Sequence, residues 1–323
     1  MSSSGSIANR MRPGRTFVRG KMKEVSFINY IRSRSVFDPA VVPVGPGDDM
    51  AVVRCGGQDI LVAADQVLDG VHFRLAEHGA RAAGRKAMAR NLSDVAAMAC
   101  EPLAAVATVA LPRGFSEADA KEMYAGLREL GDQFSCPLVG GDIATWDGAL
   151  AISLSILATP GEAGIVLRAG SRVGDAICVT GAFGGAWHTL RHLTFAPRVA
   201  EGLILGRYGL HSMIDVSDGL AIDLGHVCEA SGVGADVQAA AVPVHPDAQH
   251  RPDALAAALG DGEDYELLFT LPQDQAERLL ADKPLGDVTV TRIGTIVAGA
   301  ARSLVLADRR RQELVAGGWQ HDT

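Results

Sequence analysis

Four short acidic clusters in this 323-residue chain hold residues that suit metal and phosphate chemistry. They are residues 47–49 (Gly-Asp-Asp), 91–94 (Asn-Leu-Ser-Asp), 140–142 (Gly-Gly-Asp) and 215–219 (Asp-Val-Ser-Asp-Gly). Carboxylate oxygens are ligands that hard cations such as Mg²⁺ prefer, and glycines let the backbone come close to a phosphate. The clusters therefore indicate an enzyme that handles a Mg-bound nucleotide.

Each cluster also has an ordinary structural interpretation. The Asp-Asp pair at 48–49 fits a solvated turn, and Ser217 or Asp218 fits the N-cap of a helix that follows. Adjacent carboxylates that are buried, however, repel each other and have raised pKa values unless a cation is present. Asn91 and Asp94 share one face of an expected helix, where a metal ion is a natural partner for a buried carboxylate.

Two glycine-rich segments imitate nucleotide-binding loops. Residues 79–86 have the spacing of a P-loop, but the lysine position holds Arg85 and no Ser or Thr follows it. Residues 181–185 follow a strand but do not match G-x-G-x-x-G. Neither segment predicts a standard phosphate loop.

Alternating helical and strand patterns position these clusters. Helices are expected at 25–33, 77–98, 116–130 and from 220 to about 230, and strands at 51–54, 59–64, 103–111, 136–139, 149–158, 176–180, 212–216, 233–237, 265–271 and 288–296. Ser116 is the expected N-cap of its helix, Asp65 is expected to end a strand, and residues 140–142 are expected to form a turn. The alternation predicts α+β or α/β layers.

Composition narrows the function classes. Hydrophobic residues make up 48% of the chain and charged residues 21%, which is typical of a globular protein with a full core. The net charge of -8 argues against nucleic acid as the main partner. The five cysteines are widely spaced and form no C-x-x-C, so a disulfide framework or zinc site is not expected. No apolar run approaches the roughly 18 residues needed to span a bilayer, so no membrane association is expected.

Three segments are expected along the chain. Residues 1–24 predict a disordered leader without the apolar region of a secretory signal, and this favours a cytoplasmic location. The Pro-Gly-rich stretch at 160–164 is the candidate linker between an N-terminal domain (25–160) and a C-terminal domain (165–323).

Taken in order, the motifs give the chain a resemblance to the thiamine-monophosphate kinase family, in the superfamily of aminoimidazole ribonucleotide synthetase and selenophosphate synthetase. The matching pieces are residues 47–52, 65–73, 91–98, 139–142, 168 with 174–175, 215–220 and 262–267. The segments at 69–73 (Asp-Gly-Val-His-Phe), 91–98 and 262–267 (Gly-Glu-Asp-Tyr-Glu-Leu) look like the kinase more than its relatives.

The resemblance implies a fold, an activity and partners. The fold is an N-terminal sheet domain that dimerises, with ATP and Mg²⁺ sites, followed by a C-terminal α/β domain of the aminoimidazole ribonucleotide synthetase type. The activity is ATP-dependent phosphorylation of thiamine monophosphate to thiamine diphosphate by a homodimer. Because the acceptor is itself a phosphate anion at pH 7, no residue is expected to act as a general base.

The resemblance also implies roles for individual residues. Mg²⁺ would be held by Asp49, Asp65, Asp94, Asp142, Asp215 and Asp218. ATP would contact Tyr124, Gly141, Arg168 and Ser217. Thiamine monophosphate would contact His72, Glu263 and Trp319.

Four positions depart from the family pattern. Ala63 and Ala64 stand where a hydroxyl pair usually precedes Asp65, Asp261 replaces a glycine, and Trp319 replaces the commoner Phe or Tyr. Two alternatives therefore stay open. One is another ATP-dependent synthetase or kinase of the superfamily, and the other is a non-catalytic nucleotide-binding homologue.

Overall fold

The computed structural model describes residues 24–314. Helix α1 (Glu24–Arg34) belongs to one unit and confirms the helix expected at 25–33. Residues 35–314 belong to a second compact unit that contains both sheets of the protein. Trp319 and the expected leader, except Glu24 at the start of α1, lie outside the described residues.

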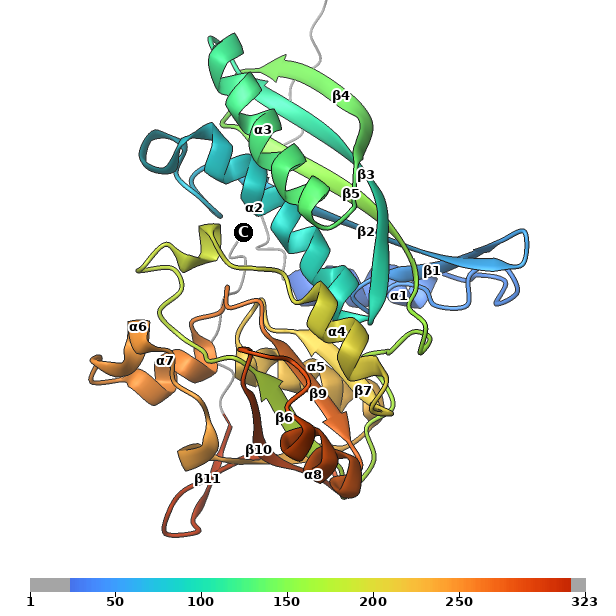
Figure 1. The fold of residues 1–323 in the computed structure, drawn as a ribbon, viewed down its shortest axis with the longest axis vertical. Coiled ribbons are helices and arrows are strands. Elements are labelled where there is room, and N and C mark those ends of the chain that lie inside the picture. Colours follow the sequence, from blue (N-terminus) through green and yellow to red (C-terminus); the bar gives the residue numbers. More distant parts are fainter. Residues whose placement is uncertain (1–23, 315–323) are drawn as a thin grey trace, which may run out of the picture. The chain divides into compact units, whose positions relative to one another are not determined.

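The first sheet is covered on one face by two long helices (Figure 1). Its strands, in spatial order, are β1 (Ala51–Cys55), β2 (Gln58–Leu68), β5 (Ala151–Pro160), β3 (Cys100–Pro112) and β4 (Leu138–Trp146). The covering helices are α2 (Leu75–Ala97) and α3 (Glu117–Gln133). Neighbouring strands pair antiparallel except β3 and β4, which are parallel.

Local sequence explains how these two helices form and pack. The Ser116 hydroxyl accepts a hydrogen bond from the Asp119 N–H at 3.0 Å, which confirms the expected N-cap of α3. Gly84 of α2 allows close approach to α3, since a Cβ there would lie 2.1 Å from the Met123 carbonyl oxygen. One of the two glycines that give residues 79–86 a P-loop spacing therefore serves helix packing.

Two expected strand boundaries were wrong. Asp65 does not end a strand, because β2 continues to Leu68 and pairs with β5 along that length. Residues 140–142 do not form a turn but lie inside β4, with Asp142 opposite Thr108 of β3. In both cases pairing with a strand distant in sequence outweighs the local turn preference of Gly and Asp.

The second sheet has seven strands. In spatial order they are β12 (Arg311–Glu313), β11 (Arg302–Val305), β8 (Gly234–Gln238), β10 (Val290–Val297), β6 (Ala176–Thr180), β9 (Leu267–Leu271) and β7 (Ser212–Asp215). The helices of this half are η1 (Arg191–Leu193), α4 (Val199–Gly206), α5 (Leu220–Ser231), η2 (Ala239–Ala241), α6 (Pro246–Gln249), α7 (Ala254–Gly260) and α8 (Gln273–Asp282). All five strands expected here are confirmed, and α5 confirms the helix after residue 219. Strands β11 and β12 and all helices of this half other than α5 were not expected from the sequence.

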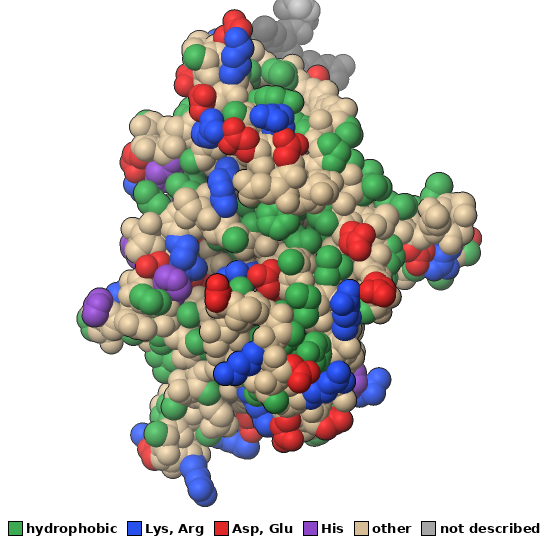
Figure 2. All heavy atoms as spheres, viewed as in Figure 1, with side chains coloured by type: hydrophobic (Ala, Val, Ile, Leu, Met, Phe, Trp, Pro, Cys, Tyr) green, Lys and Arg blue, Asp and Glu red, His purple; other side chains and the backbone are tan. Residues whose placement is uncertain are grey.

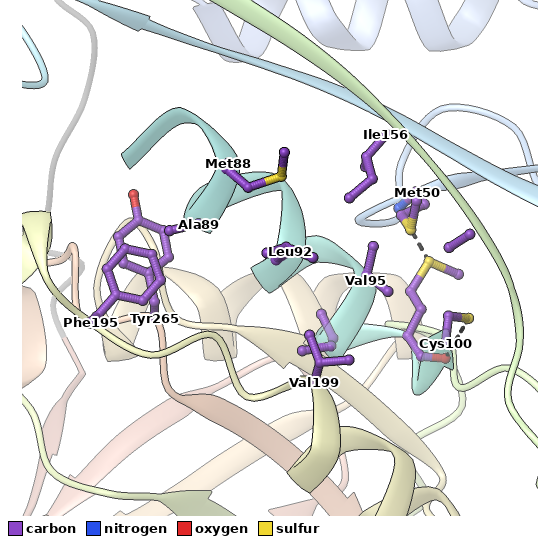
Figure 3. Packing of buried hydrophobic residues seen from close by; sticks show 14 of the residues in the cluster. Met50, Met88, Ala89, Leu92, Val95, Cys100, Ile156, Phe195, Val199 and Tyr265 are labelled. Carbon is purple, nitrogen blue, oxygen red and sulfur yellow. Dashed lines mark hydrogen bonds between the residues drawn. The ribbon is translucent and has the colours of Figure 1, made fainter. Parts of the chain in front are cut away.

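A hydrophobic core extends from the first sheet into the second half of the chain. Buried side chains of β5 and α2 belong to the same cluster as Leu205 of α4, Phe269 of β9 and Leu279 of α8. Figure 3 shows part of it, with Leu92 of α2 in the centre and Phe195 stacked on Tyr265. The expected boundary at 160–165 stays a prediction. Among residues 24–314, no helix is both long and apolar enough to cross a membrane.

Candidate active site

Four of the expected metal-binding carboxylates come together inside the protein. Asp94 lies on α2, Asp65 on β2, Asp215 at the end of β7, and Asp49 just before β1. Burial raises the pKa of Asp94 well above its usual value, and the charges of Asp65, Asp215 and Asp49 raise it further. A buried carboxylate that is repelled by three other carboxylates needs a positively charged partner to stay ionised.

The neighbours of Asp94 are similarly crowded. Burial, followed by the charge of Asp49, raises the pKa of Asp215 to about 7, although a 2.5 Å hydrogen bond from the Ser93 hydroxyl opposes that rise. Burial and the adjacent Asp49 also raise the pKa of Asp48 to about 6. These internal acids contrast with the charges that Figure 2 shows on one face of the molecule, where both signs are intermixed.

Two arginines neutralise part of this negative charge. The Arg90 Nε lies 2.8 Å from Oδ2 of Asp65. Arg168 holds the Asp-Asp pair, with its Nη2 at 2.5 Å from Asp49 Oδ1 and its backbone N–H donating to Asp48 Oδ2 at 3.0 Å. The expected ATP contact Arg168 therefore lies within the carboxylate cluster.

The donor set fits Mg²⁺. Asp49 Oδ2 is buried and has no hydrogen-bond partner among the described residues. An unpartnered carboxylate oxygen beside other buried carboxylates is a hard-oxygen environment of the kind that Mg²⁺ prefers. Asp49, Asp65, Asp94 and Asp215 are the residues that would hold such ions.

A second group of possible ligands lies at the start of α5. Asp218, Asp223 and His226 each have a ligand atom within 4.8 Å of the others. Asp223 also accepts hydrogen bonds from the backbone N–H groups of Asp218 and Gly219, at 3.1 and 3.0 Å. Asp218 was expected from the sequence. Asp223 and His226 were not, although their spacing of three on a helix indicates a shared face.

The expected substrate contact Glu263 lies beside the expected ATP contact Ser217. The backbone N–H of Glu263 donates to the Ser217 carbonyl at 2.7 Å, and that of Tyr265 donates to the Val216 carbonyl at 2.8 Å. Gly262 makes this pairing possible, since its φ is +70° and a Cβ would lie 2.8 Å from the Ser217 carbonyl oxygen. The segment at 262–266 is thus fixed against the 215–218 loop.

Glu263 also joins a buried polar group around Lys86. The ammonium of Lys86 donates to the Glu263 carboxylate at 2.5 Å, to the His72 carbonyl at 2.8 Å and to His192 Nδ1 at 2.7 Å. Of the other two expected substrate residues, His72 is buried and belongs to the same group, and Trp319 lies outside the described residues. Neither Lys86 nor His192 was among the site residues expected from the sequence.

Three expected site residues lie apart from the carboxylate cluster. Tyr124 is half-exposed on α3, and Gly141 and Asp142 are exposed on the edge strand β4. Asp142 is paired with the exposed Thr108, so it lies on the sheet face that α2 and α3 leave uncovered. Within the described chain, the interactions that join Asp49, Asp65, Asp94 and Asp215 do not include these residues.

The structure clarifies two departures from the family pattern. Only Ala63 shares the helix-covered face of β2 with Asp65, because Ala64 pairs with Ser155 on the opposite face. A hydroxyl at 63, but not at 64, would point to the same side as Asp65. Asp261, in place of a glycine, accepts hydrogen bonds from Gly185 N–H at 2.9 Å and from Arg251 at 2.6 Å.

Comparison with protein families identifies both halves of the chain. Residues 47–159 match the N-terminal domain of AIR synthase related proteins, and residues 191–306 match the C-terminal domain. These matches and the two mixed α/β sheets confirm the fold class expected from the sequence.

Individual relatives are similar over nearly their full length. A thiamine-monophosphate kinase from Rhodopirellula baltica is 36% identical over 312 residues, which cover 92% of this chain and 97% of the relative. The solved structure of AaThiL complexed with AMPPCP and TMP matches with a TM-score of 0.79 at 26% identity, over 93% of this chain and 97% of that one. Thiamine-monophosphate kinase from Stenotrophomonas maltophilia K279a matches with a TM-score of 0.70 at 33% identity, over 88% and 96%.

The level of identity, the coverage and the shared domains agree with the motifs at 69–73, 91–98 and 262–267. The chain belongs to the thiamine-monophosphate kinase family of AIR synthase related proteins.

Proposed function

We propose that this protein transfers the γ-phosphate of ATP directly and in line to thiamine monophosphate, giving thiamine diphosphate and ADP, with the help of several Mg²⁺ ions. The observation that carries this proposal is the convergence of Asp49, Asp65, Asp94 and Asp215 from four separate segments of the chain. Such a site is too acidic to bind ATP or a phosphate monoester unaided, and it suits their Mg²⁺ complexes.

The acceptor needs no base from the protein. The second pKa of a phosphate monoester is near 6, so at pH 7 thiamine monophosphate already carries an anionic oxygen that can attack. The difficulty is to bring two anions together in line. Bound Mg²⁺ would supply the neutralising charge for that approach.

The protein's own residues would bind and orient the two substrates. Arg168 and Ser217 would contact ATP, since both lie next to the carboxylate cluster. Glu263 and His72 would contact the thiamine side, since both belong to the buried polar group around Lys86. Tyr124 and Gly141 are further proposed ATP contacts, and Asp142 and Asp218 further Mg²⁺ ligands.

We also propose that the enzyme works as a homodimer in the cytoplasm. The uncovered face of the first sheet supports the dimer, because Val106 of β3 and Leu157 of β5 are 42% and 39% exposed there. Exposed apolar side chains gathered on a sheet face favour burial against another surface. Light scattering on the purified protein, with Val106→Asp as the disrupting variant, tests this: a monomeric wild-type protein would contradict it.

The deciding experiment measures ADP and thiamine diphosphate formed from ATP and thiamine monophosphate, with and without Mg²⁺. Free thiamine serves as the control acceptor. Mg²⁺-dependent product from the monophosphate alone is the expected result. ATP binding without product would favour a non-catalytic homologue, or an enzyme of the superfamily with another substrate.

A further inference from the structure

Lys86 is a fully buried cation that lies next to the expected substrate contact Glu263. Its side chain is 0% exposed, although it comes from the middle of α2. An ammonium has three N–H donors and no acceptor. All three donors have partners here, which are His72 O, His192 Nδ1 and Glu263 Oε2.

These three acceptors belong to segments far apart in sequence. His72 follows β2, His192 lies in η1, and Glu263 precedes β9. Lys86 therefore connects the helix of the first half to three separate segments, and two of them carry the residues proposed to contact thiamine monophosphate. Burying a charge is unfavourable unless it is fully paired, so the arrangement tolerates little displacement of any partner.

The hydrogen bonds also define the state of His192. Because Nδ1 accepts from the ammonium, the ring proton of neutral His192 must be on Nε2. Burial, followed by the charge of Lys86, lowers the pKa of His192 to about 3, so the ring stays neutral. It stacks on Trp187 with centroids 4.4 Å apart, which holds the acceptor in place. His192 thus accepts the third hydrogen bond of the Lys86 ammonium and adds no second positive charge beside it.

We propose that Lys86 is a positioning residue for thiamine monophosphate binding, which acts by fixing the Glu263 carboxylate and the backbone of His72. This inference rests on the proposed function, since it takes these two residues as the thiamine contacts. The affinity for thiamine monophosphate then depends on one buried ammonium group that does not itself contact the substrate.

Steady-state kinetics of Lys86→Met tests the proposal, because Met keeps an unbranched apolar stem and removes the charge. The KM for thiamine monophosphate should rise about 10- to 100-fold, the effect of losing hydrogen bonds to a charged group. The KM for ATP should change less than about twofold, because Arg168 and Ser217 keep their contacts. An equal rise in both KM values, or no rise for thiamine monophosphate, would overturn the proposal.

A double-mutant cycle with Glu263→Gln separates positioning from general stability. If Lys86 acts through Glu263, the double variant should have a KM no higher than the worse single variant, whereas independent roles would give multiplied effects and contradict the proposal. The double variant also avoids an unpaired buried carboxylate, so it keeps the test available where Lys86→Met alone does not fold.

Arg85→Met is the matched control. Arg85 lies next to Lys86 and also ties α2 to the following half, by donating to the carbonyls of Leu193, Thr194 and Phe195 at 2.7 to 3.0 Å. It should leave the ratio of the two KM values unchanged, and a shift equal to that of Lys86→Met would show that mere loosening of α2 is responsible. An active wild-type enzyme with an unaffected Lys86→Met variant would overturn this inference alone. A wild-type enzyme unable to phosphorylate thiamine monophosphate would overturn the proposed function as well.

Discussion

Asp49 and Arg168 form an ion pair between the first sheet and the segment that follows the candidate linker, with Arg168 Nη2 at 2.5 Å from Asp49 Oδ1. The other oxygen of the same carboxylate, Oδ2, is buried without a hydrogen-bond partner in the described part of the chain. One carboxylate therefore faces an expected ATP contact on one side and is available to a metal ion on the other.

Arg168→Met should weaken ATP binding and make stability depend on Mg²⁺. The KM for ATP should rise about tenfold or more, since a charge-assisted contact is lost. Asp49 would be left buried and unpaired, so the melting temperature should fall further in EDTA than in Mg²⁺. Arg172→Met is the control, because Arg172 is exposed nearby. Wild-type values of both KM and melting temperature would contradict the assignment.

Asp94→Asn should abolish most of the activity and preserve the fold. We expect turnover at saturating Mg²⁺ to fall at least about 10²-fold, because a central oxygen ligand with its charge is lost. Without Mg²⁺ the variant should melt no lower than the wild type, since one of several mutually repelling carboxylates is gone. Turnover close to that of the wild type would rule out the role given to Asp94.

Sequence reasoning succeeded where the signal was local. The Ser116 cap and the helix expected at 116–130 depend on residues within a few positions of each other, and both are confirmed. It failed for β4, because Gly140 and Gly141 have a local turn preference while their pairing partner, β3, lies about 30 residues earlier.

The site was predictable in part for the same reason. Acidic clusters with Gly or Ser form recognisable motifs, and three of the four contribute carboxylates that meet in the structure, together with Asp65 of β2. The fourth cluster, at 140–142, lies apart on β4. Lys86 and His192 have no such motif, since a lysine in an Ala-rich helix is usually solvated. Only tertiary packing brings its ammonium to acceptors 106 and 177 residues later in the chain.

Gly262→Ala should disturb both stability and substrate binding. A positive φ costs about 1–2 kcal/mol for a non-glycine residue, and the Cβ would clash with the Ser217 carbonyl. Gly299→Ala is a matched control, because Gly299 has φ +86° with nothing within 4 Å of its Cβ position. The free energy of unfolding should fall by about 1–3 kcal/mol more for Gly262→Ala, with a raised KM for thiamine monophosphate. Equal losses in the two variants would show that the close approach to Ser217 is unimportant.

Thiamine monophosphate binding should weaken as pH rises through about 8. Burial lowers the pKa of Lys86 from 10.5 to about 8, opposed by Glu263 and Asp65 and assisted by Arg90, with neutral His192 also facing the ammonium. Above this pH the amine loses one donor and its charge, so the KM should rise, approaching tenfold per pH unit. The substrate phosphate, whose second pKa is near 6, is already ionised throughout this range.

The expected rise in KM is distinguishable from unfolding. Because the folded pKa of Lys86 is below its unfolded value, this group's contribution to the free energy of unfolding increases between pH 8 and 10.5. Kinetics from pH 7 to 9.5 should show the rise for the wild type and a flat profile for Lys86→Met. A flat wild-type profile would contradict the role of the ammonium charge.

Lys86, Arg90 and Asp94 follow each other at intervals of four residues on α2, so they lie along one face of the helix. Lys86 contacts Glu263, and Asp94 lies among the buried carboxylates. At 1.5 Å per residue their backbones span about 12 Å, and inserting or deleting one residue would turn one end by about 100° relative to the other. The helical backbone is interrupted at Gly79, where φ is +77°, and not between these three residues. During evolution, changes of length should therefore be accepted before Gly79 and rejected between Lys86 and Asp94, even where the intervening side chains vary.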